Sequence, residues 1–156
     1  MADEVAERIA ALLDEHHVMS LATIGGQGPH AASLFYARER FRLFWISDPA
    51  SRHSQDIALD GRVAATIAGD HSGFATIRGL QLSGHAGRVA DEAENRGARR
   101  ILEARYPFLK QPTDASLRAG YERAGIYRLD VARFDLIDNS RGFGHKDVWE
   151  PRGSAV

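Results

Sequence analysis

The sequence of 156 residues contains no cysteine, which excludes disulfide bonds, thiolate metal sites and cysteine nucleophiles. It also lacks an excess of either charge, because 20 basic residues face 21 acidic ones and the formal net charge is -1. Bulk attraction to nucleic acid or to an anionic membrane is therefore excluded, and any affinity for anions must be local. No apolar run approaches the roughly 20 residues of a membrane-spanning helix, and the acidic, amphipathic N-terminal stretch is unlike a signal peptide. We expect a cytoplasmic protein that has no nucleic-acid or membrane partner.

Hydrophobic patterning predicts short strands with a few helices. Val5, Ile9 and Leu12 recur at helical spacing, whereas the other apolar segments are mostly short and are joined by tight turns, as in an antiparallel meander. Three interior glycines in residues 74–90 are typical of a strand that bends around a closed barrel. The pattern predicts a mainly β protein of the α+β class, an antiparallel barrel with peripheral helices. We expect strands at residues 17–24, 30–38, 42–47, 62–69, 74–90 and 126–138, and helices at residues 2–16, 51–59, 91–107 and 115–125.

One stretch between a strand and a helix, "SDPASRHSQDIA" (residues 47–58), has the composition of a phosphate site. The N-terminus of a helix carries unpaired N–H groups and a partial positive charge. Ser51 adds a hydroxyl, Arg52 adds a fork of donors, and a protonated His53 adds one more. The alternative is that Asp48 or Ser51 only caps a surface helix while Arg52 points into water.

Other chemical motifs are not supported. Seven histidines are present, but His16 and His17 are adjacent, and the remaining ones lie on separate elements with no dense carboxylate pattern, so we expect no metal site. The segment "GGQGPH" lacks the Gly-Lys-Ser/Thr ending of a phosphate loop and fits a hairpin turn. No Gly-x-Ser-x-Gly elbow is present, so a hydrolase triad is unsupported.

The order of several strings is informative beyond each string alone. "GPHAASLFYA", "RLFWIS", "SRHSQDI", "RVAATI", "IRGLQLSGHA" and "NSRGFGH" follow one another along the chain. This series resembles the FMN-binding split-barrel superfamily, of which pyridoxamine 5'-phosphate oxidase is the best-known member, and is most similar to its YhbP-like branch. The resemblance covers about residues 5–147. It implies a six-stranded split barrel, a homodimer, and FMN held in two grooves at the dimer interface.

The resemblance also implies which residues contact FMN. The oxidase holds the FMN phosphate with a Ser-Arg-Lys string, which corresponds here to Ser51-Arg52-His53, with His in place of Lys. The family residues that end the preceding strand near the flavin correspond to Ile46 and Ser47, and residues 32–36 would line the flavin ring. In the fifth strand the Arg of the family's Arg-Gln pair corresponds to Arg78, a second cation, and its Gln corresponds to Gly79. We expect Gln81, two residues further along the same face of the strand, to reach the polar edge of the ring. The expected cofactor-binding residues are Ser33, Ile46, Ser47, Ser51, Arg52, His53, Arg78 and Gln81.

The chain departs from the oxidase in its second strand, where "AASLFYA" lacks the Arg and the terminal Lys that serve phosphate groups. The pyridoxal phosphate site is thus not reproduced, and we do not predict vitamin B6 oxidation. Arg141 and His145 lie loosely where the oxidase contacts its substrate, and we expect them in a substrate pocket; the alternative is a surface tail. We expect one FMN-binding domain at residues 1–147, followed by a mobile tail at residues 148–156.

The resulting hypothesis is an FMN-dependent oxidoreductase that acts on an unknown small molecule. A second hypothesis is a split barrel that binds FMN, F420 or haem without turnover, with His145 or His30 as a haem ligand. A third is a barrel that only binds a protein partner or has a structural role. The chromophore that co-purifies with the protein, followed by the effect of Arg52→Ala, separates these hypotheses.

Overall fold

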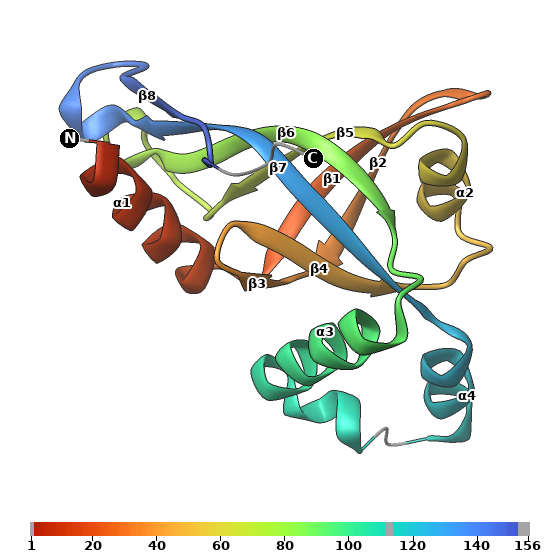
Figure 1. Ribbon diagram of the computed structural model, residues 1–156. Helices are drawn as coiled ribbons and strands as arrows, with labels where there is room; N and C mark the ends of the chain where they lie inside the picture. The colour runs from red at the N-terminus through yellow and green to blue at the C-terminus, as the bar shows by residue number, and fades with distance from the viewer. Residues whose placement is uncertain (1, 112–113, 153–156) are drawn as a thin grey trace.

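One curled antiparallel sheet forms the framework of the molecule (Figure 1). The computed structural model describes residues 2–111 and 114–152, and within these it contains eight strands, four α-helices and three short 3-10 helices. The strands are β1 (Val18–Gly25), β2 (Gly28–Phe35), β3 (Ala37–Glu39), β4 (Arg42–Ser47), β5 (Arg62–Ala68), β6 (Arg78–Arg88), β7 (Gly125–Asp138) and β8 (Lys146–Trp149). The helices are α1 (Ala2–Glu15), α2 (Arg52–Leu59), η1 (Phe74–Thr76), α3 (Glu92–Arg105), η2 (Pro107–Lys110), α4 (Ala115–Arg123) and η3 (Asn139–Arg141).

The strand order is β2-β1-β5-β6-β7-β4-β3, and β8 pairs with β7. The long β7 pairs with β6 along most of its length, with β4 along its first half and with β8 along its second half. A bulge between Ser83 and Gly84 interrupts the β6–β7 register, as expected for a glycine-containing strand that bends around a barrel. The path begins at β2 and ends at β3, which leaves the barrel split. The expected split-barrel fold is therefore confirmed.

The expected count of six strands is wrong. Residues 30–38 divide into β2 and β3 at Tyr36, whose side chain turns fully into the core. Its hydroxyl donates to the carbonyl oxygens of Leu13, at 2.7 Å, and His16, at 3.0 Å. The hydroxyl thus ties the break between the two strands to the last turn of α1. The other additional strand is β8, in a segment whose sequence shows no periodicity.

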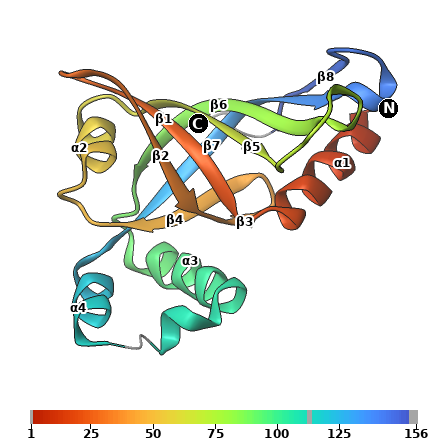
Figure 2. The same ribbon diagram turned by 180° about the vertical axis from the view of Figure 1, so that it is seen from behind.

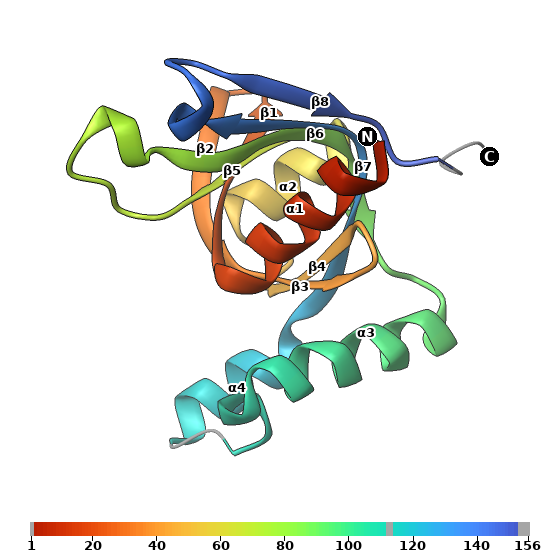
Figure 3. The same ribbon diagram turned by 90° about the vertical axis from the view of Figure 1, so that its left-hand side faces the viewer.

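The core fills the inside of the curled sheet. Alternate residues of β1 and β5 point inward, and most of them are apolar. Helix α1 packs Ile9, Leu12 and Leu13 into one end of the barrel, while Ile57 of α2 packs into the same core from the other end. Figure 3 looks along the barrel, with α1 in front of the strands and α2 behind them. The two helices therefore occupy opposite ends, which matters for the placement of the expected site residues.

Helices α3 and α4 lie outside the barrel, below it in the view of Figure 2. A second, smaller core joins α3 to the outer side of β4 and contains Phe44, Ala98, Leu102 and Tyr106. Strand β4 is consequently buried on both faces, which explains its almost continuous apolar sequence "RLFWIS".

Two expected boundaries differ from the structure. Residues 74–76 form η1 instead of the start of a strand, and β6 begins at Arg78. The expected boundary between residues 147 and 148 falls inside β8, where Trp149 packs against Phe41 with ring centroids 4.4 Å apart. Residues 153–156 of the expected mobile tail lie outside the described residues. None of the helices in the described ranges has the length and apolar character needed to cross a membrane.

Candidate functional site

The N-terminus of α2 brings together side chains that were expected to hold a phosphate. We call Ser47, Ser51, Arg52, His53 and Ser54 the α2 cluster. Ser51 is the N-cap in an extended conformation, and its hydroxyl oxygen accepts from the backbone N–H of Ser54 at 3.3 Å. The same hydroxyl donates to the Ser54 hydroxyl at 2.8 Å. The other N–H groups of the first turn have no acceptor inside the helix, so they are available to an anion.

His53 connects two hydroxyls of this cluster. Its Nε2 is 2.8 Å from the hydroxyl oxygen of Ser47 and 3.2 Å from that of Ser51. Burial lowers the pKa of His53, the nearby ring of His30 lowers it further, and the carboxylate of Asp56 opposes both effects. A neutral His53 with its proton on Nδ1 accepts a hydrogen bond from a serine hydroxyl at Nε2.

Arg52 does not point freely into water. Its Nη2 donates to the carbonyl oxygen of Gln27, at 3.4 Å, in the turn between β1 and β2. Its Nε is buried, and within the part of the chain that the structure describes it has no hydrogen-bond partner. A buried donor without a partner is costly. A phosphate oxygen would satisfy it, so the donors of the α2 cluster fit the phosphate of FMN.

A buried carboxylate fixes α2 against the sheet. The hydroxyl of Thr23 on β1 donates to Asp56 Oδ2 at 2.8 Å, and Asp56 is only 7% exposed. Gly25 leaves room for this carboxylate, because a Cβ at that position would lie 1.8 Å from Asp56 Oδ1. Sequence reasoning missed these three residues, since nothing in the sequence links Thr23 to a partner 33 positions away.

Ser33 and Gln81 lie elsewhere, on the outer face of the sheet. Ser20 pairs with Ser33 on one side and with Thr66 on the other, and Thr66 pairs with Gln81. These four side chains form one exposed row across β2, β1, β5 and β6. Ile46 faces away from Ser47 and packs against the small core beneath α3.

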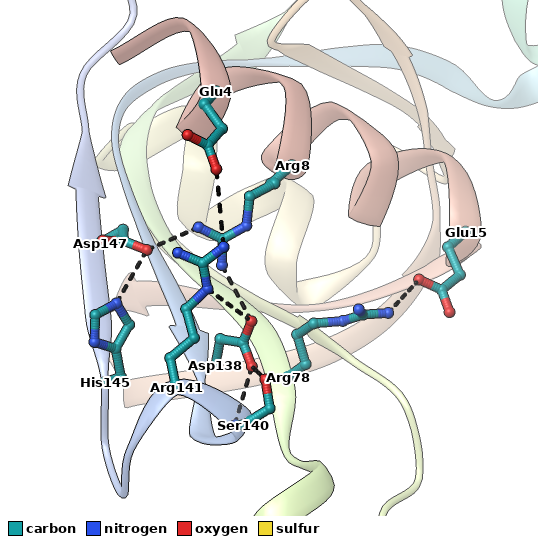
Figure 4. A network of polar contacts seen from close by, with 9 residues as sticks. All are labelled: Glu4, Arg8, Glu15, Arg78, Asp138, Ser140, Arg141, His145 and Asp147. Carbon is teal, nitrogen blue, oxygen red and sulfur yellow. Dashed lines mark hydrogen bonds and ion pairs between the residues drawn. The ribbon is translucent and has the colours of Figure 1, made fainter. Parts of the chain in front are cut away.

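Arg78, Arg141 and His145 belong to a third group, at the α1 end of the barrel (Figure 4). Arg78 Nη2 is 3.3 Å from Glu15 Oε2 at the end of α1. Arg141 Nε is 3.8 Å from Asp138 Oδ2. His145 Nε2 is 3.3 Å from Asp147 Oδ2. The same oxygen also contacts Arg8 of α1.

Arg8 is the centre of this network. It donates to Asp147 Oδ2 at 2.9 Å and to Asp138 Oδ2 at 3.1 Å, so one side chain of α1 holds both the end of β7 and the start of β8. We call Arg8, Asp138, Asp147 and their partners the η3 network. Between the two carboxylates the chain turns through Gly142 and Gly144, whose φ angles of 131° and 71° favour glycine.

Apart from Ile46, the expected site residues thus form three separate groups in one chain. Ser47, Ser51, Arg52 and His53 lie together at the α2 end. Arg78, Arg141 and His145 lie at the opposite end, beside α1 (Figure 4). A wide groove of about 1050 Å³ lies beside the β3–β4 turn and β8, away from all three groups. None of the expected site residues lines it. Its arginines Arg42 and Arg128 are both paired with Asp130.

Comparisons with known proteins agree with this architecture. The family model for pyridoxamine 5'-phosphate oxidase matches residues 5–124. A UPF0306 protein of Cronobacter sakazakii is 30% identical over 148 residues, which cover 94% of this chain and 95% of that protein. The solved structure of a heme binding protein from Mycobacterium smegmatis has a TM-score of 0.72 at 23% identity, covering 96% of this chain and 58% of the other. General Stress Protein 26 from Bacillus anthracis has a TM-score of 0.66 at 15% identity, covering 95% and 99%. The chain therefore belongs to the pyridoxamine 5'-phosphate oxidase family of split-barrel proteins, in the YhbP-like branch of the UPF0306 proteins.

Proposed function

We propose that this protein binds FMN through a phosphate site at the N-terminus of α2 and uses the flavin to oxidise or reduce a small organic molecule. The observation that carries the proposal is the buried Nε of Arg52, which has no hydrogen-bond partner among the described residues and belongs to the first turn of α2, next to the cap Ser51. Family membership supports the choice of a flavin among phosphate-bearing ligands.

The residues of the α2 cluster have distinct tasks in this proposal. Arg52 supplies a permanent positive charge and paired donors for phosphate oxygens. Ser51 and the first backbone N–H groups of α2 supply neutral donors, and His53 supplies a second positive charge when protonated. Bound flavin would supply the redox chemistry, accepting or giving electrons, while the protein binds and orients it.

We also propose that the protein works as a homodimer. Within one chain, Arg78, Arg141 and His145 lie at the α1 end and Gln81 lies on the outer face of the sheet, so none of them joins the α2 cluster. A second copy packed on the outer face of the sheet, in reversed orientation, would place its α1 end beside the α2 end of the first. The exposed row that contains Ser33 and Gln81 carries short or uncharged side chains, which permit close approach of a flat ring or a second sheet. A cytoplasmic location stays a prediction from the sequence.

The substrate is expected to differ from vitamin B6 phosphates. The second strand along the chain, β2, carries no lysine or arginine. A phosphate-bearing substrate would therefore lack the Arg and Lys contacts that the oxidase provides. Arg141 and His145 remain our candidates for substrate contact. Among the described residues, Arg141 is within 4 Å of the carboxylates of Glu4 and Asp138, and His145 is within 4 Å of that of Asp147.

A second candidate is haem or F420 binding without turnover. The specific observation in its favour is the similarity to the heme binding protein from Mycobacterium smegmatis. His30, which is half-buried beside His53, and His145 are the candidate iron ligands. The absorbance spectrum of the purified protein separates the cases, because flavin, F420 and haem absorb differently. A Soret band in the wild type that disappears in His30→Ala or His145→Ala would show that the protein binds haem instead of FMN.

The decisive experiment compares FMN with riboflavin, which lacks the phosphate. Stripped protein is titrated with each ligand while flavin fluorescence is recorded. We expect tighter binding of FMN, and a loss of about 10- to 100-fold in FMN affinity for Arg52→Ala with little change for riboflavin. Arg62→Ala is the matched control, because Arg62 lies just beyond the other end of α2 and pairs with Asp60. Absence of saturable FMN binding, or normal FMN affinity in Arg52→Ala, would refute the proposal.

A further inference from the structure

His53 occupies a position where a change of its charge alters the site directly. Its Nε2 faces two hydroxyls, of Ser47 from the end of β4 and of Ser51 at the cap of α2. Both hydroxyls also belong to the cluster that would surround a phosphate. When the His53 ring is neutral, Arg52 is the one positive charge of the α2 cluster. When the ring is protonated, the charges of His53 and Arg52 together nearly balance those of a phosphate dianion.

The surroundings of the ring favour the neutral form while the site holds no anion. His30 approaches from β2 and Asp56 from the same helix, and burial together with His30 lowers the pKa of His53. Asp56 acts in the opposite direction, but its Oδ2 is already bonded to Thr23 at 2.8 Å. A phosphate at the helix N-terminus would place an opposite charge beside the ring and thereby favour protonation.

We propose that His53 takes up a proton when a phosphate-bearing ligand binds at the N-terminus of α2, so that FMN affinity falls as the pH rises through neutrality. This inference rests on the proposed FMN site and adds its regulation. The Lys of the oxidase string would be charged throughout this range, so the coupling follows from the His at this position. Ser47 is the positioning residue, because its buried hydroxyl holds Nε2 toward the cluster.

The direction of the effect follows from proton linkage. At a pH below the pKa of His53 in the free site, the ring is charged before and after binding and this group adds no pH dependence. Between the pKa of the free site and the higher pKa of the complex, binding takes up a proton and affinity falls up to tenfold per pH unit. The second ionisation of the phosphate, near pH 6, acts in the opposite direction. A reference variant is needed to cancel it.

The experiment measures FMN dissociation constants from pH 6 to pH 9 for the wild type and for His53→Lys. The phosphate ionises equally in both, so we expect the ratio of wild-type to variant constants to rise about tenfold across this range. Riboflavin should show no such rise. Ser47→Ala should shift the midpoint of the wild-type pH profile, and Ser47→Thr should restore it, which a purely structural role would not produce.

Calorimetry of the wild type alone provides an independent readout. FMN binding at pH 7.5, measured in buffers of different ionisation enthalpy, should show net proton uptake of at least a few tenths of a proton. Saturable FMN binding with no proton uptake, or a constant ratio between the two proteins, would overturn the role of His53 and leave the FMN site standing. Absence of FMN binding would overturn both.

Discussion

Replacing Arg8 with Met tests whether the η3 network holds α1 on the barrel. The substitution keeps a similar apolar stem and removes the two charged hydrogen bonds to Asp138 and Asp147. Hydrogen bonds to charged groups contribute about 1.5–3 kcal/mol each when buried, whereas exposed ion pairs contribute about 0–1 kcal/mol. The side chains of Arg8, Asp138 and Asp147 are 22%, 11% and 25% exposed. An intermediate value of about 1 kcal/mol for each bond is therefore appropriate.

The expected loss is about 2 kcal/mol in the free energy of unfolding, or roughly 4–8 °C in melting temperature for a domain of this size. Urea denaturation followed by circular dichroism measures it. Arg96→Met is the matched control, because the Arg96–Glu92 pair spans 3.9 Å and both side chains are largely exposed. We expect the control to lose less than about 0.5 kcal/mol. An Arg8→Met variant as stable as this control would refute the reasoning.

The pH dependence provides a second check on the same network. The hydrogen bonds from Ser140 are the main cause that lowers the pKa of Asp138, and those from Arg8 are the main cause that lowers the pKa of Asp147. A carboxyl whose pKa is lowered by folding contributes stability above its unfolded pKa, and this contribution is lost as the pH falls through the folded pKa. The difference in the free energy of unfolding between the wild type and Arg8→Met should therefore have its full value at pH 6–7 and decrease below about pH 4.

Two further substitutions test contacts that position α2 and α1. Gly25→Ala places a methyl group against the carboxylate of Asp56, so we expect a loss of about 2–3 kcal/mol in the free energy of unfolding, together with weaker FMN binding. Gly26→Ala is the control, because a methyl group there meets no atom within 4 Å, and it should change stability by less than about 1 kcal/mol. Equal unfolding midpoints in urea for these two variants would contradict the role of Gly25. Tyr36→Phe removes the donor to the carbonyl oxygen of Leu13, and we expect a loss of about 1–2 kcal/mol with faster hydrogen exchange in the last turn of α1. Unchanged exchange there would contradict the proposed link.

The sequence predicted the parts of the fold that local patterns determine. Strand β4 occupies residues 42–47 as expected, and α2 and β5 end within a residue or so of their expected bounds. Alternation of apolar residues, capping serines and Gly-rich turns act over a few residues, so a reader of the sequence can find them. The cap at Ser51 belongs to this class.

Contacts between distant segments were not predictable in the same way. Arg8 and Asp147 are 139 positions apart, and neither residue stands out in the sequence. The segment "NSRGFGH" was expected to lie near a substrate. In the structure it forms the turn between β7 and β8, and its Asp138 and Asp147 neighbours hold α1. The glycines that suggested close approach to a ligand are explained at least as well by the left-handed backbone of this turn.

The two interpretations of "SRHSQDIA" turn out to be compatible. Ser51 caps α2 by accepting from the Ser54 N–H, which satisfies one donor of the first turn and leaves others available. What separates a plain cap from an anion site is the position of Arg52, since a cap alone needs no guanidinium. Arg52 lies over the β1–β2 turn, and its buried Nε has no hydrogen-bond partner among the described residues, although an extended side chain in water would have kept all its donors hydrated. This arrangement supports the proposed phosphate site, in which the hydroxyls of the α2 cluster and His53 would suit an anion better than a neutral ligand.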